Sequence, residues 1–340
     1  MRLALQLAEK GKGSVAPNPM VGCVITKANE IIAQGYHQRY GEAHAEVNAI
    51  NSLPADFDFT GCTLYVNLEP CSHYGKTPPC SDLIIAKKIK RVVVANLDSN
   101  PLVAGKGLEK LKNAGIEVKS GVLNDEAREL NKRFFVFHEK KRPYIILKWA
   151  ETKDGFISKL PAPSQKEDNW ITCNQSKELV HLWRSEEQAI MVGTTTVLLD
   201  NPELTTRLVK GKNPTRIIVD RELKIPHTAK VFVPGEKTIV ITEKAVEDTE
   251  NSSYCTVSFD KDFVSTLLRN LYLLNIQSVI IEGGSKLLNI FIVAGVWDEA
   301  RVFVGEKVFE KGLPAPVFNK EGASITKINS DTLYWKKNIL

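Results

Sequence analysis

Four side chains in the first third of the sequence have the types and order of a catalytic metal site. His44 and Glu46 stand two residues apart, and Cys71 and Cys80 follow, separated by eight residues. Two thiolates and an imidazole form a soft ligand set that suits zinc, and three protein ligands leave the fourth tetrahedral position for water. Glu46 can take a proton from that water and return it to a substrate. These residues therefore predict a zinc-dependent hydrolytic site.

The spacing of these residues requires the starts of helices. Positions i and i+2 point in different directions in mid-helix, so His44 and Glu46 converge only where a helix begins near His44. Cys80 follows Pro78 and Pro79, which favour a helix N-terminus whose positive end stabilises a thiolate. Together these segments match the zinc-deaminase signature H-x-E…P-C…C. The remaining cysteines are interpreted as inert thiols in apolar or strand-like contexts: Cys23, Cys62, Cys173 and Cys255.

Strands alternating with helices must position these motifs. In the first part of the chain the hydrophobic pattern predicts strands at 21–26, 31–35, 63–68, 91–95 and 116–119, and helices at 3–9, 44–52, 80–88, 106–114 and 125–138. In the second part it predicts strands at 144–150, 189–192, 216–219, 238–241 and 278–281, and helices at 176–185, 261–274 and 285–294. A charge run that ends at Pro143 marks a boundary, so we expect domains over residues 1–142 and 143–340, both of the α/β class.

Composition limits the classes of protein to which this chain can belong. Its 340 residues are 43% hydrophobic and 25% charged, which excludes disordered, collagenous and coiled-coil chains. The longest apolar stretch, 287–297, is shorter than the roughly 20 residues of a membrane span, and the first residues lack the pattern of an export leader. The short apolar stretch leads us to expect no membrane partner. Six cysteines are too few for a disulfide scaffold, so we expect a cytoplasmic location.

The net charge of +5 arises entirely in residues 1–142, because the second part is neutral overall. One basic cluster, Lys87, Lys88, Lys90 and Arg91, could be a nucleic-acid patch or the solvated end of a helix. A few lysines near one helix end fall short of a basic face, so we favour the solvated helix end and expect no nucleic-acid partner.

Two strand-to-helix turns in the second part have residues suited to phosphate binding. The strand at 189–192 runs into Gly193 and three threonines, and the strand at 278–281 meets Glu282, Gly283 and Gly284. Backbone amides and hydroxyls at such turns bind phosphate groups. Each turn alone is more often a plain strand-to-helix connection. No G-x-G-x-x-G motif follows the opening strand, which disfavours a standard dinucleotide-binding fold.

The first part resembles the pyrimidine deaminases of riboflavin biosynthesis, a family in which the deaminase is fused to a reductase. The resemblance rests on Pro17-Asn-Pro-Met-Val-Gly22, Gly35-Tyr-His37 and the long cysteine spacing of Pro70-Cys-Ser-His-Tyr-Gly-Lys-Thr-Pro-Pro-Cys80. It implies a cytidine-deaminase-like α/β/α fold and deamination of a diaminohydroxy-pyrimidinone ribosylamine 5-phosphate. Asn18 would read the pyrimidine edge, or it is a turn residue between two prolines. The candidates for contact with the ribose phosphate are His37, His73 and Lys76.

The second part resembles the riboflavin-pathway reductase, whose fold is dihydrofolate-reductase-like and whose cofactor is NADPH. The matching segments are Arg142-Pro143 through Leu147-Lys148, Asp154-Gly155, Trp170-Ile-Thr172, Gly193 to Arg207, and Glu282-Gly-Gly. The resemblance implies hydride delivery to the sugar carbon attached to nitrogen. The residues that it places against the cofactor are Ala150, Trp170, Thr196, Asp200, Gly284, Ser285 and Lys286. The residues that it places against the substrate are Lys148, Arg184, Leu204, Arg207 and Glu282.

The charged members of this set suggest roles that the sequence alone does not separate. Arg184 and Arg207 suit a substrate phosphate, because guanidinium binds phosphate with two parallel hydrogen bonds. Asp200 or Glu282 could assist proton movement, and each could instead be a capping or ion-paired carboxylate. Asp168 stands where the family often has serine, and its charge would repel a phosphate, so it is given no binding role.

Two other functions use the same metal ligands. A nucleic-acid base deaminase would have a short Cys-x-x-Cys spacing and a basic second domain, and this chain has neither. A structural zinc module would require a fourth protein ligand. The prediction is therefore a bifunctional enzyme with Zn²⁺ and NADPH as cofactors and a phosphorylated pyrimidine as substrate, which we expect to form a homo-oligomer.

Overall fold

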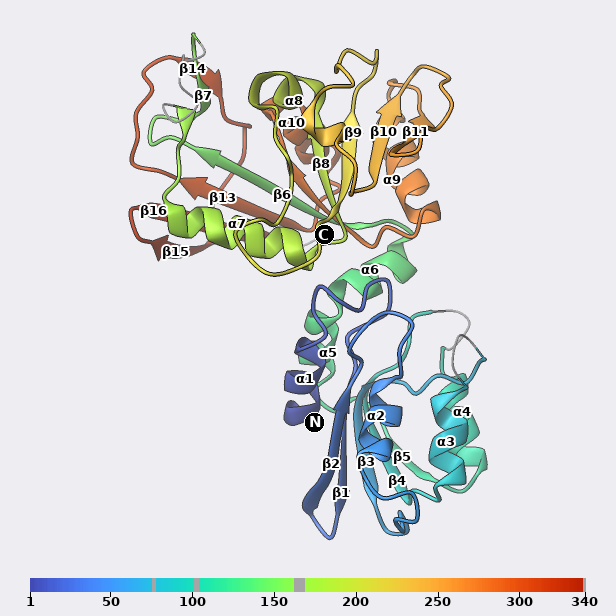
Figure 1. The fold of residues 1–340 in the computed structure, drawn as a ribbon. Helices are drawn as coiled ribbons and strands as arrows, with labels where there is room; N and C mark the ends of the chain where they lie inside the picture. The colour runs from blue at the N-terminus through green and yellow to red at the C-terminus, as the bar shows by residue number, and fades with distance from the viewer. Residues whose placement is uncertain (75–77, 101–103, 162–168, 339–340) are drawn as a thin grey trace. The chain divides into compact units, whose positions relative to one another are not determined.

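Two units with separate cores make up the chain in the computed structural model, which describes residues 1–74, 78–100, 104–161 and 169–338 (Figure 1). Contacts within the chain divide it into Met1–Lys141 and Arg142–Leu340. The domain boundary expected from the sequence lies one residue later. Lys76 and Asp168 lie outside the described residues.

A mixed five-stranded sheet in the order β2-β1-β3-β4-β5 forms the centre of the first unit. Its strands are β1 (Gly22–Lys27), β2 (Glu30–Tyr36), β3 (Thr63–Leu68), β4 (Arg91–Asn96) and β5 (Glu117–Lys119). Strand β1 pairs antiparallel with β2 and β3, whereas β3, β4 and β5 are parallel. The turn between β1 and β2 has positive φ at Ala28 (51°) and Asn29 (68°), as a two-residue hairpin turn requires. Because β3 and β4 are parallel neighbours, their carboxyl ends meet at one end of the sheet.

Helices cover both faces of this sheet (Figure 1). They are α1 (Arg2–Glu9), α2 (Ala45–Asn51), α3 (Cys80–Ala86), α4 (Lys106–Asn113), α5 (Asn124–Leu130) and α6 (Lys132–Lys140). Successive strand residues point to opposite faces, so Val24 packs with α1 while Ile25 joins the core under α2, α3 and α4. A Cβ on Gly22 would lie 2.0 Å from the Ala4 oxygen, and one on Gly35 would lie 2.4 Å from the Ala49 nitrogen. Both glycines are therefore needed for the close approach of α1 and α2.

The single helix predicted over 125–138 is wrong, because α5 and α6 are separate helices. Asn131 interrupts them with φ −101° and ψ 24°. Its side-chain oxygen accepts from the Met20 amide at 2.8 Å, and its side-chain nitrogen donates to the Met20 oxygen at 2.8 Å. This pairing with a distant loop residue explains why the helical pattern breaks at a polar side chain.

The second unit contains a nine-stranded sheet in the order β11-β10-β9-β8-β12-β6-β13-β16-β15. The strands are β6 (Tyr144–Glu151), β8 (Ala189–Gly193), β9 (Thr215–Val219), β10 (Thr238–Thr242), β11 (Ser252–Thr256), β12 (Ser278–Glu282), β13 (Glu299–Val304), β15 (Ser324–Ile328) and β16 (Asp331–Lys337). Those from β11 to β13 in the sheet order are parallel, and β16 and β15 pair antiparallel. A separate antiparallel pair joins β7 (Phe156–Lys159) and β14 (Gly312–Pro314). The five strands expected in this part are present, and the strands missed are short or half-exposed except for β13.

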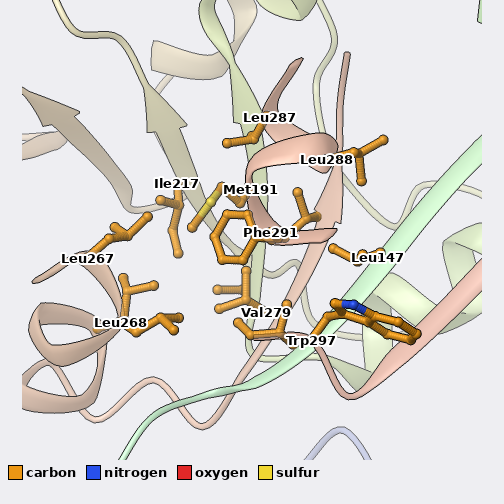
Figure 2. Packing of buried hydrophobic residues seen from close by; sticks show 14 of the residues in the cluster. Leu147, Met191, Ile217, Leu267, Leu268, Val279, Leu287, Leu288, Phe291 and Trp297 are labelled. Carbon is orange, nitrogen blue, oxygen red and sulfur yellow. The ribbon is translucent and has the colours of Figure 1, made fainter. Parts of the chain in front are cut away.

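Helices of the second unit enclose a large apolar core. They are α7 (Asn174–Glu186), α8 (Thr194–Asp200), α9 (Phe263–Leu273), α10 (Ser285–Ala294) and the 3-10 turn η2 (Lys230–Phe232). Figure 2 shows Phe291 of α10 inserted among Met191, Val279 and other apolar residues of the sheet. The apolar stretch 287–297 is thus a core helix with its C-terminal turn. Within the described ranges, no helix has the length and apolar character needed to cross a membrane.

Candidate functional site

The residues of the predicted metal site converge at the ends of three elements in the first unit. His44 is the extended residue that precedes α2, with φ −72° and ψ 165°, and Glu46 lies in the first turn of that helix. Cys80 is the first residue of α3, and Cys71 lies three residues beyond β3. Nδ1 of His44 is 3.3 Å from Sγ of Cys80 and 3.6 Å from Sγ of Cys71. The helix-start geometry required by the sequence spacing is therefore present.

The separation of these donor atoms fits a tetrahedral zinc ion. Zinc–sulfur and zinc–nitrogen bonds of about 2.3 Å and 2.0 Å place N and S about 3.5 Å apart at a tetrahedral angle. The ligand atoms of His44, Cys71 and Cys80 all lie within 4.8 Å of one another. Among the residues that the structure describes, no fourth His, Cys, Asp or Glu joins this cluster. The donor set is thus that of an open, catalytic site rather than a closed, structural one.

The electrostatics of this cluster suit metal binding and proton transfer. Hydrogen bonds with the Cys80 thiol and the His44 imidazole lower the pKa of Cys71 to about 4, so one thiolate exists before a cation binds. Glu46 is buried, and burial together with the Cys71 charge raises its pKa to about 7. A carboxyl group with a pKa near neutrality can both accept and return a proton.

Asn18 and His37 form a hydrogen-bonded pair beside this cluster. The Asn18 amide nitrogen lies 3.0 Å from His37 Nε2, and His37 Nδ1 lies 3.0 Å from the Ala43 oxygen. The His37 ring is only 2% exposed and packs edge-on against the His44 ring. Burial lowers the pKa of His37, so the ring is neutral and provides no charge to a phosphate. The position of His37 therefore suits orientation of the Asn18 amide. His73, by contrast, is exposed on the segment between Cys71 and Cys80.

A second polar cluster lies in the second unit, around the carboxylate of Glu282. Nζ of Lys148 is 3.3 Å from this carboxylate across the β6–β12 pairing, and the Arg184 guanidinium binds both of its oxygens. Burial alone would raise the pKa of Glu282, but Arg184 and Lys148 overcome this effect and lower it to about 2. Arg184 also donates to the Thr205 oxygen at 3.2 Å. The Arg184 guanidinium is therefore hydrogen-bonded within the protein. The sequence analysis, which assigned Arg184 to a substrate phosphate, did not predict these partners.

Two of the expected cofactor turns lie side by side. Strands β8 and β12 are neighbours, so Gly193 and Gly284, which precede α8 and α10, lie at the same end of the sheet. The Gly284 amide donates to Thr196 Oγ1 at 3.0 Å. The seven-residue helix α8 after Gly193 agrees with the strand-to-helix turn expected there, although the sequence analysis gave no bounds for the helix.

The other residues assigned to the reductase are distributed around these two clusters. Ala150 follows Lys148 on the same face of β6, because strand residues two apart share a face. Arg207 is half-exposed beside Glu203, and the Leu204 side chain is buried. Trp170 is 43% exposed with Lys177 Nζ 3.6 Å from its ring centre. The exposed residues at helix ends are Asp200, at the end of α8, and Lys286, which follows Ser285 in the first turn of α10.

His181 was missed by the sequence analysis although it shares an electrostatic environment with these residues. It precedes Arg184 by one turn of α7, is 4% exposed, and its Nδ1 has no hydrogen-bond partner among the described atoms. Burial and the cations Arg184 and Arg207 lower its pKa to about 4. A lone histidine in a helix carries no sequence signal beyond its spacing from Arg184.

Comparisons with known proteins match both units separately. Residues 1–96 match the family model for the cytidine and deoxycytidylate deaminase zinc-binding region, and residues 143–331 match the model for the RibD C-terminal domain. The second match is incompatible with a nucleic-acid deaminase carrying an accessory RNA-binding domain. The expected α/β folds of the two parts are confirmed.

Relatives match over nearly the whole chain. Riboflavin biosynthesis protein RibD of Aquifex aeolicus is 47% identical over 318 residues, covering 92% of this chain and 88% of that protein. The RibD protein of Escherichia coli is 38% identical, covering 91% of this chain and 87% of that protein. A diaminohydroxyphosphoribosylaminopyrimidine deaminase/5-amino-6-(5-phosphoribosylamino)uracil reductase of Thermotoga maritima superposes with a TM-score of 0.88 at 40% identity, covering 99% and 97% of the two chains. RibD of Acinetobacter baumannii superposes with a TM-score of 0.87 at 33% identity, covering 100% of this chain and 98% of that chain. The chain therefore belongs to the RibD family of bifunctional riboflavin-pathway enzymes, with a zinc-binding deaminase domain and a reductase domain.

Proposed function

We propose that the first unit removes the ring amine of 2,5-diamino-6-(5-phosphoribosylamino)pyrimidin-4-one, and that the second unit reduces the ribosyl group of the resulting uracil to ribityl with NADPH. The observation that carries this proposal is the presence, in one chain, of the His44–Cys71–Cys80 cluster with Glu46 and the separate Glu282–Lys148–Arg184 cluster. The name of the Thermotoga maritima relative, which covers both units, supports the same pair of reactions.

In the deaminase unit, His44, Cys71 and Cys80 would hold zinc. A bound zinc ion supplies Lewis acidity and increases the acidity of water at neutral pH. Glu46 takes a proton as the water oxygen adds to the amine-bearing ring carbon, and it passes a proton to the amine nitrogen as the carbon–nitrogen bond breaks and ammonia leaves. Its pKa of about 7 suits both transfers. Asn18, whose amide is hydrogen-bonded to His37, would read the pyrimidine edge.

In the reductase unit, the residues proposed to hold the cofactor are Ala150, Trp170, Thr196, Asp200, Gly284, Ser285 and Lys286. Bound NADPH would supply a hydride for the sugar carbon of the ring-opened imine, whose nitrogen would gain a proton. Glu282 has a pKa of about 2 and therefore holds no proton at neutral pH. In this proposal Glu282 keeps Lys148 charged and in place, so it is not the proton donor, and the imine nitrogen takes its proton from water, with Asp200 as the remaining candidate for assisting that transfer.

The arginines of the reductase unit divide between two tasks in this proposal. Arg184 is already held by Glu282, whereas the half-exposed Arg207 pairs only loosely with Glu203 at 3.8 Å. We therefore assign the substrate phosphate to Arg207. The buried Leu204, three residues earlier, would help to fix the segment that carries Arg207. In the deaminase unit, the exposed His73 is the described candidate for that phosphate, and Lys76 remains a prediction from the sequence. The homo-oligomeric state and the cytoplasmic location also remain predictions.

One assay tests the two reactions together. The zinc-loaded chain is supplied with the phosphorylated diaminopyrimidine, and ammonia release and NADPH absorbance are followed in parallel. We expect ammonia to be released even when NADPH is omitted. When NADPH is present, we expect its oxidation to begin only after ammonia has appeared. Direct addition of the deaminated uracil should give NADPH oxidation without ammonia. Ammonia from cytidine or deoxycytidylate, with none from the diaminopyrimidine, would contradict the proposed substrate, and faster turnover with NADH would contradict the cofactor.

A further inference from the structure

Glu69 is a buried carboxylate to which neither reaction assigns a role. It is the residue that follows β3 and lies two positions before Cys71, and it is 4% exposed. Four backbone amides donate to it: Gly107 at 2.8 Å and Leu108 at 3.2 Å to Oε1, and Gly105 at 2.9 Å and Asp98 at 3.2 Å to Oε2. A carboxylate that accepts so many backbone hydrogen bonds away from solvent is strongly held.

These amides belong to both ends of the connection from β4 to α4. Asp98 lies two residues after β4, whereas Gly105, Gly107 and Leu108 lie at the start of α4. A helix cap needs only the amides of the first turn. The additional bond to Asp98 means that Glu69 ties the beginning of this connection to its end, which an ordinary cap does not do.

The same segment touches the metal site. The amide of Glu69 donates to the Asn96 oxygen at 3.0 Å, which holds the ends of the parallel strands β3 and β4 together. A Cβ on Gly107 would lie 2.1 Å from the Pro70 oxygen, so the start of α4 packs directly on the residue before Cys71. The Asp98 amide is joined to the same segment, because it donates to Glu69, two residues before Cys71. Glu69 thus connects Asp98 and the start of α4 to the segment that carries a metal ligand.

We propose that Glu69 is a positioning residue of the deaminase: by binding the amides of Asp98 and of the first turn of α4, it holds Asp98 against the metal site where the pyrimidine substrate binds. His44 and Glu46 lie at the start of α2 and Cys80 begins α3, whereas the amides that Glu69 binds belong to the connection from β4 to α4. We therefore expect loss of Glu69 to weaken substrate binding more than it slows the chemical step. This inference rests on the proposed deaminase substrate for its assay.

The test replaces Glu69 by glutamine. One of the two acceptor oxygens then becomes an NH₂ group, which is a donor and cannot accept hydrogen bonds from the backbone amides. The matched control is Glu109→Gln, which removes the same charge from the exposed side of the first turn of α4. In Glu69→Gln we expect the KM for deamination to rise by about tenfold or more while kcat changes by less than about threefold. Zinc content and reductase activity of the same chain should be unchanged. Glu109→Gln should have the wild-type KM.

Three results would overturn the proposal: an unchanged KM in Glu69→Gln, an equal rise in Glu109→Gln, or loss of zinc, which would place the effect on Cys71 instead. Absence of ammonia release by the unsubstituted chain would instead refute the proposed substrate. If Glu69→Gln does not fold, amide hydrogen exchange in the unsubstituted, zinc-loaded chain replaces it. The amides of Asp98, Gly105 and Gly107 should exchange more slowly when the deaminated product is bound. Identical rates with and without product would refute the positioning role.

Discussion

Both carboxylate oxygens of Glu282 accept hydrogen bonds from Arg184, Oε1 from Nε at 2.9 Å and Oε2 from Nη2 at 2.8 Å. Lys148 approaches the same carboxylate at 3.3 Å, so one buried anion balances two nearly buried cations. Removing one member of such a group leaves buried charge uncompensated. Glu282 is therefore the residue on which the charge balance of this cluster depends.

Replacement of Glu282 by glutamine should destabilise the second unit by about 3 kcal/mol, because Arg184 and Lys148 would face each other without a counter-charge. All five tryptophans of the chain lie in residues 142–340, so tryptophan fluorescence during denaturation reports on this unit alone. Reductase activity should fall and deaminase activity should persist. A denaturation midpoint equal to that of the unsubstituted chain would show that the ion pairs contribute nothing net.

Acid should abolish the stability difference between these two proteins. The folded-state pKa of Glu282 is lowered from 4.5 to about 2, so its contribution is complete above pH 4.5 and is lost as the pH falls toward 2. A pKa shift of this size corresponds to a contribution of about 3 kcal/mol to the free energy of unfolding. Urea denaturation of the unsubstituted chain and of Glu282→Gln, followed between pH 7 and pH 3, should give midpoints that converge below pH 4.5. If the difference between the two denaturation midpoints grew as the pH fell, Glu282 could not be the ionised partner of Arg184 and Lys148.

The parts of this structure that the sequence predicted depend on local signals. Prolines before Cys80 and the paired His44 and Glu46 indicate helix starts, and alternating apolar residues indicate buried strands. The interruption at Asn131 could not be predicted, because its cause is a contact with Met20, more than a hundred residues away. The four bonds to Glu69 likewise join segments that only the fold brings together.

The same limit applies to the roles of charged residues. The sequence places Arg184 and Arg207 on equal terms as phosphate ligands, since the resemblance places both arginines against the substrate. Only the geometry shows that Glu282 already binds Arg184. His181 has no signal in the sequence beyond its spacing from Arg184, because the other charged groups around it, Arg207, Glu282 and Lys148, come from other parts of the chain.

Replacement of Arg207 by alanine should raise the KM for the phosphorylated uracil by about tenfold or more, because a charge-assisted hydrogen bond to phosphate is lost. The KM for NADPH should stay within about twofold. Arg269→Ala removes an equal charge from the exposed side of α9 and serves as the control. An unchanged substrate KM, measured by steady-state NADPH oxidation, would reassign the phosphate to another residue.

Removal of zinc should separate the two activities. All three proposed ligands lie in Met1–Lys141, so dialysis against a chelator should abolish ammonia release and leave reduction of the deaminated uracil intact. Metal analysis before and after dialysis should show the loss of one ion per chain, and added zinc should restore ammonia release. A parallel loss of reductase activity would mean that the metal also supports the second unit.

Replacement of Glu46 by glutamine tests the proton-transfer role without removing a ligand. The side chain keeps its size in the first turn of α2, and the ligand atoms of His44, Cys71 and Cys80 are untouched, so zinc content should remain at one ion per chain. Glutamine cannot accept the proton from water, and kcat for ammonia release should fall by about 10²- to 10⁴-fold. Reductase activity of the same chain provides the control for folding. Because the Glu46 carboxyl group titrates near pH 7, the residual activity should also lose any pH dependence that arises from this group. Ammonia release at an undiminished rate, with zinc retained, would exclude Glu46 as the residue that moves the proton.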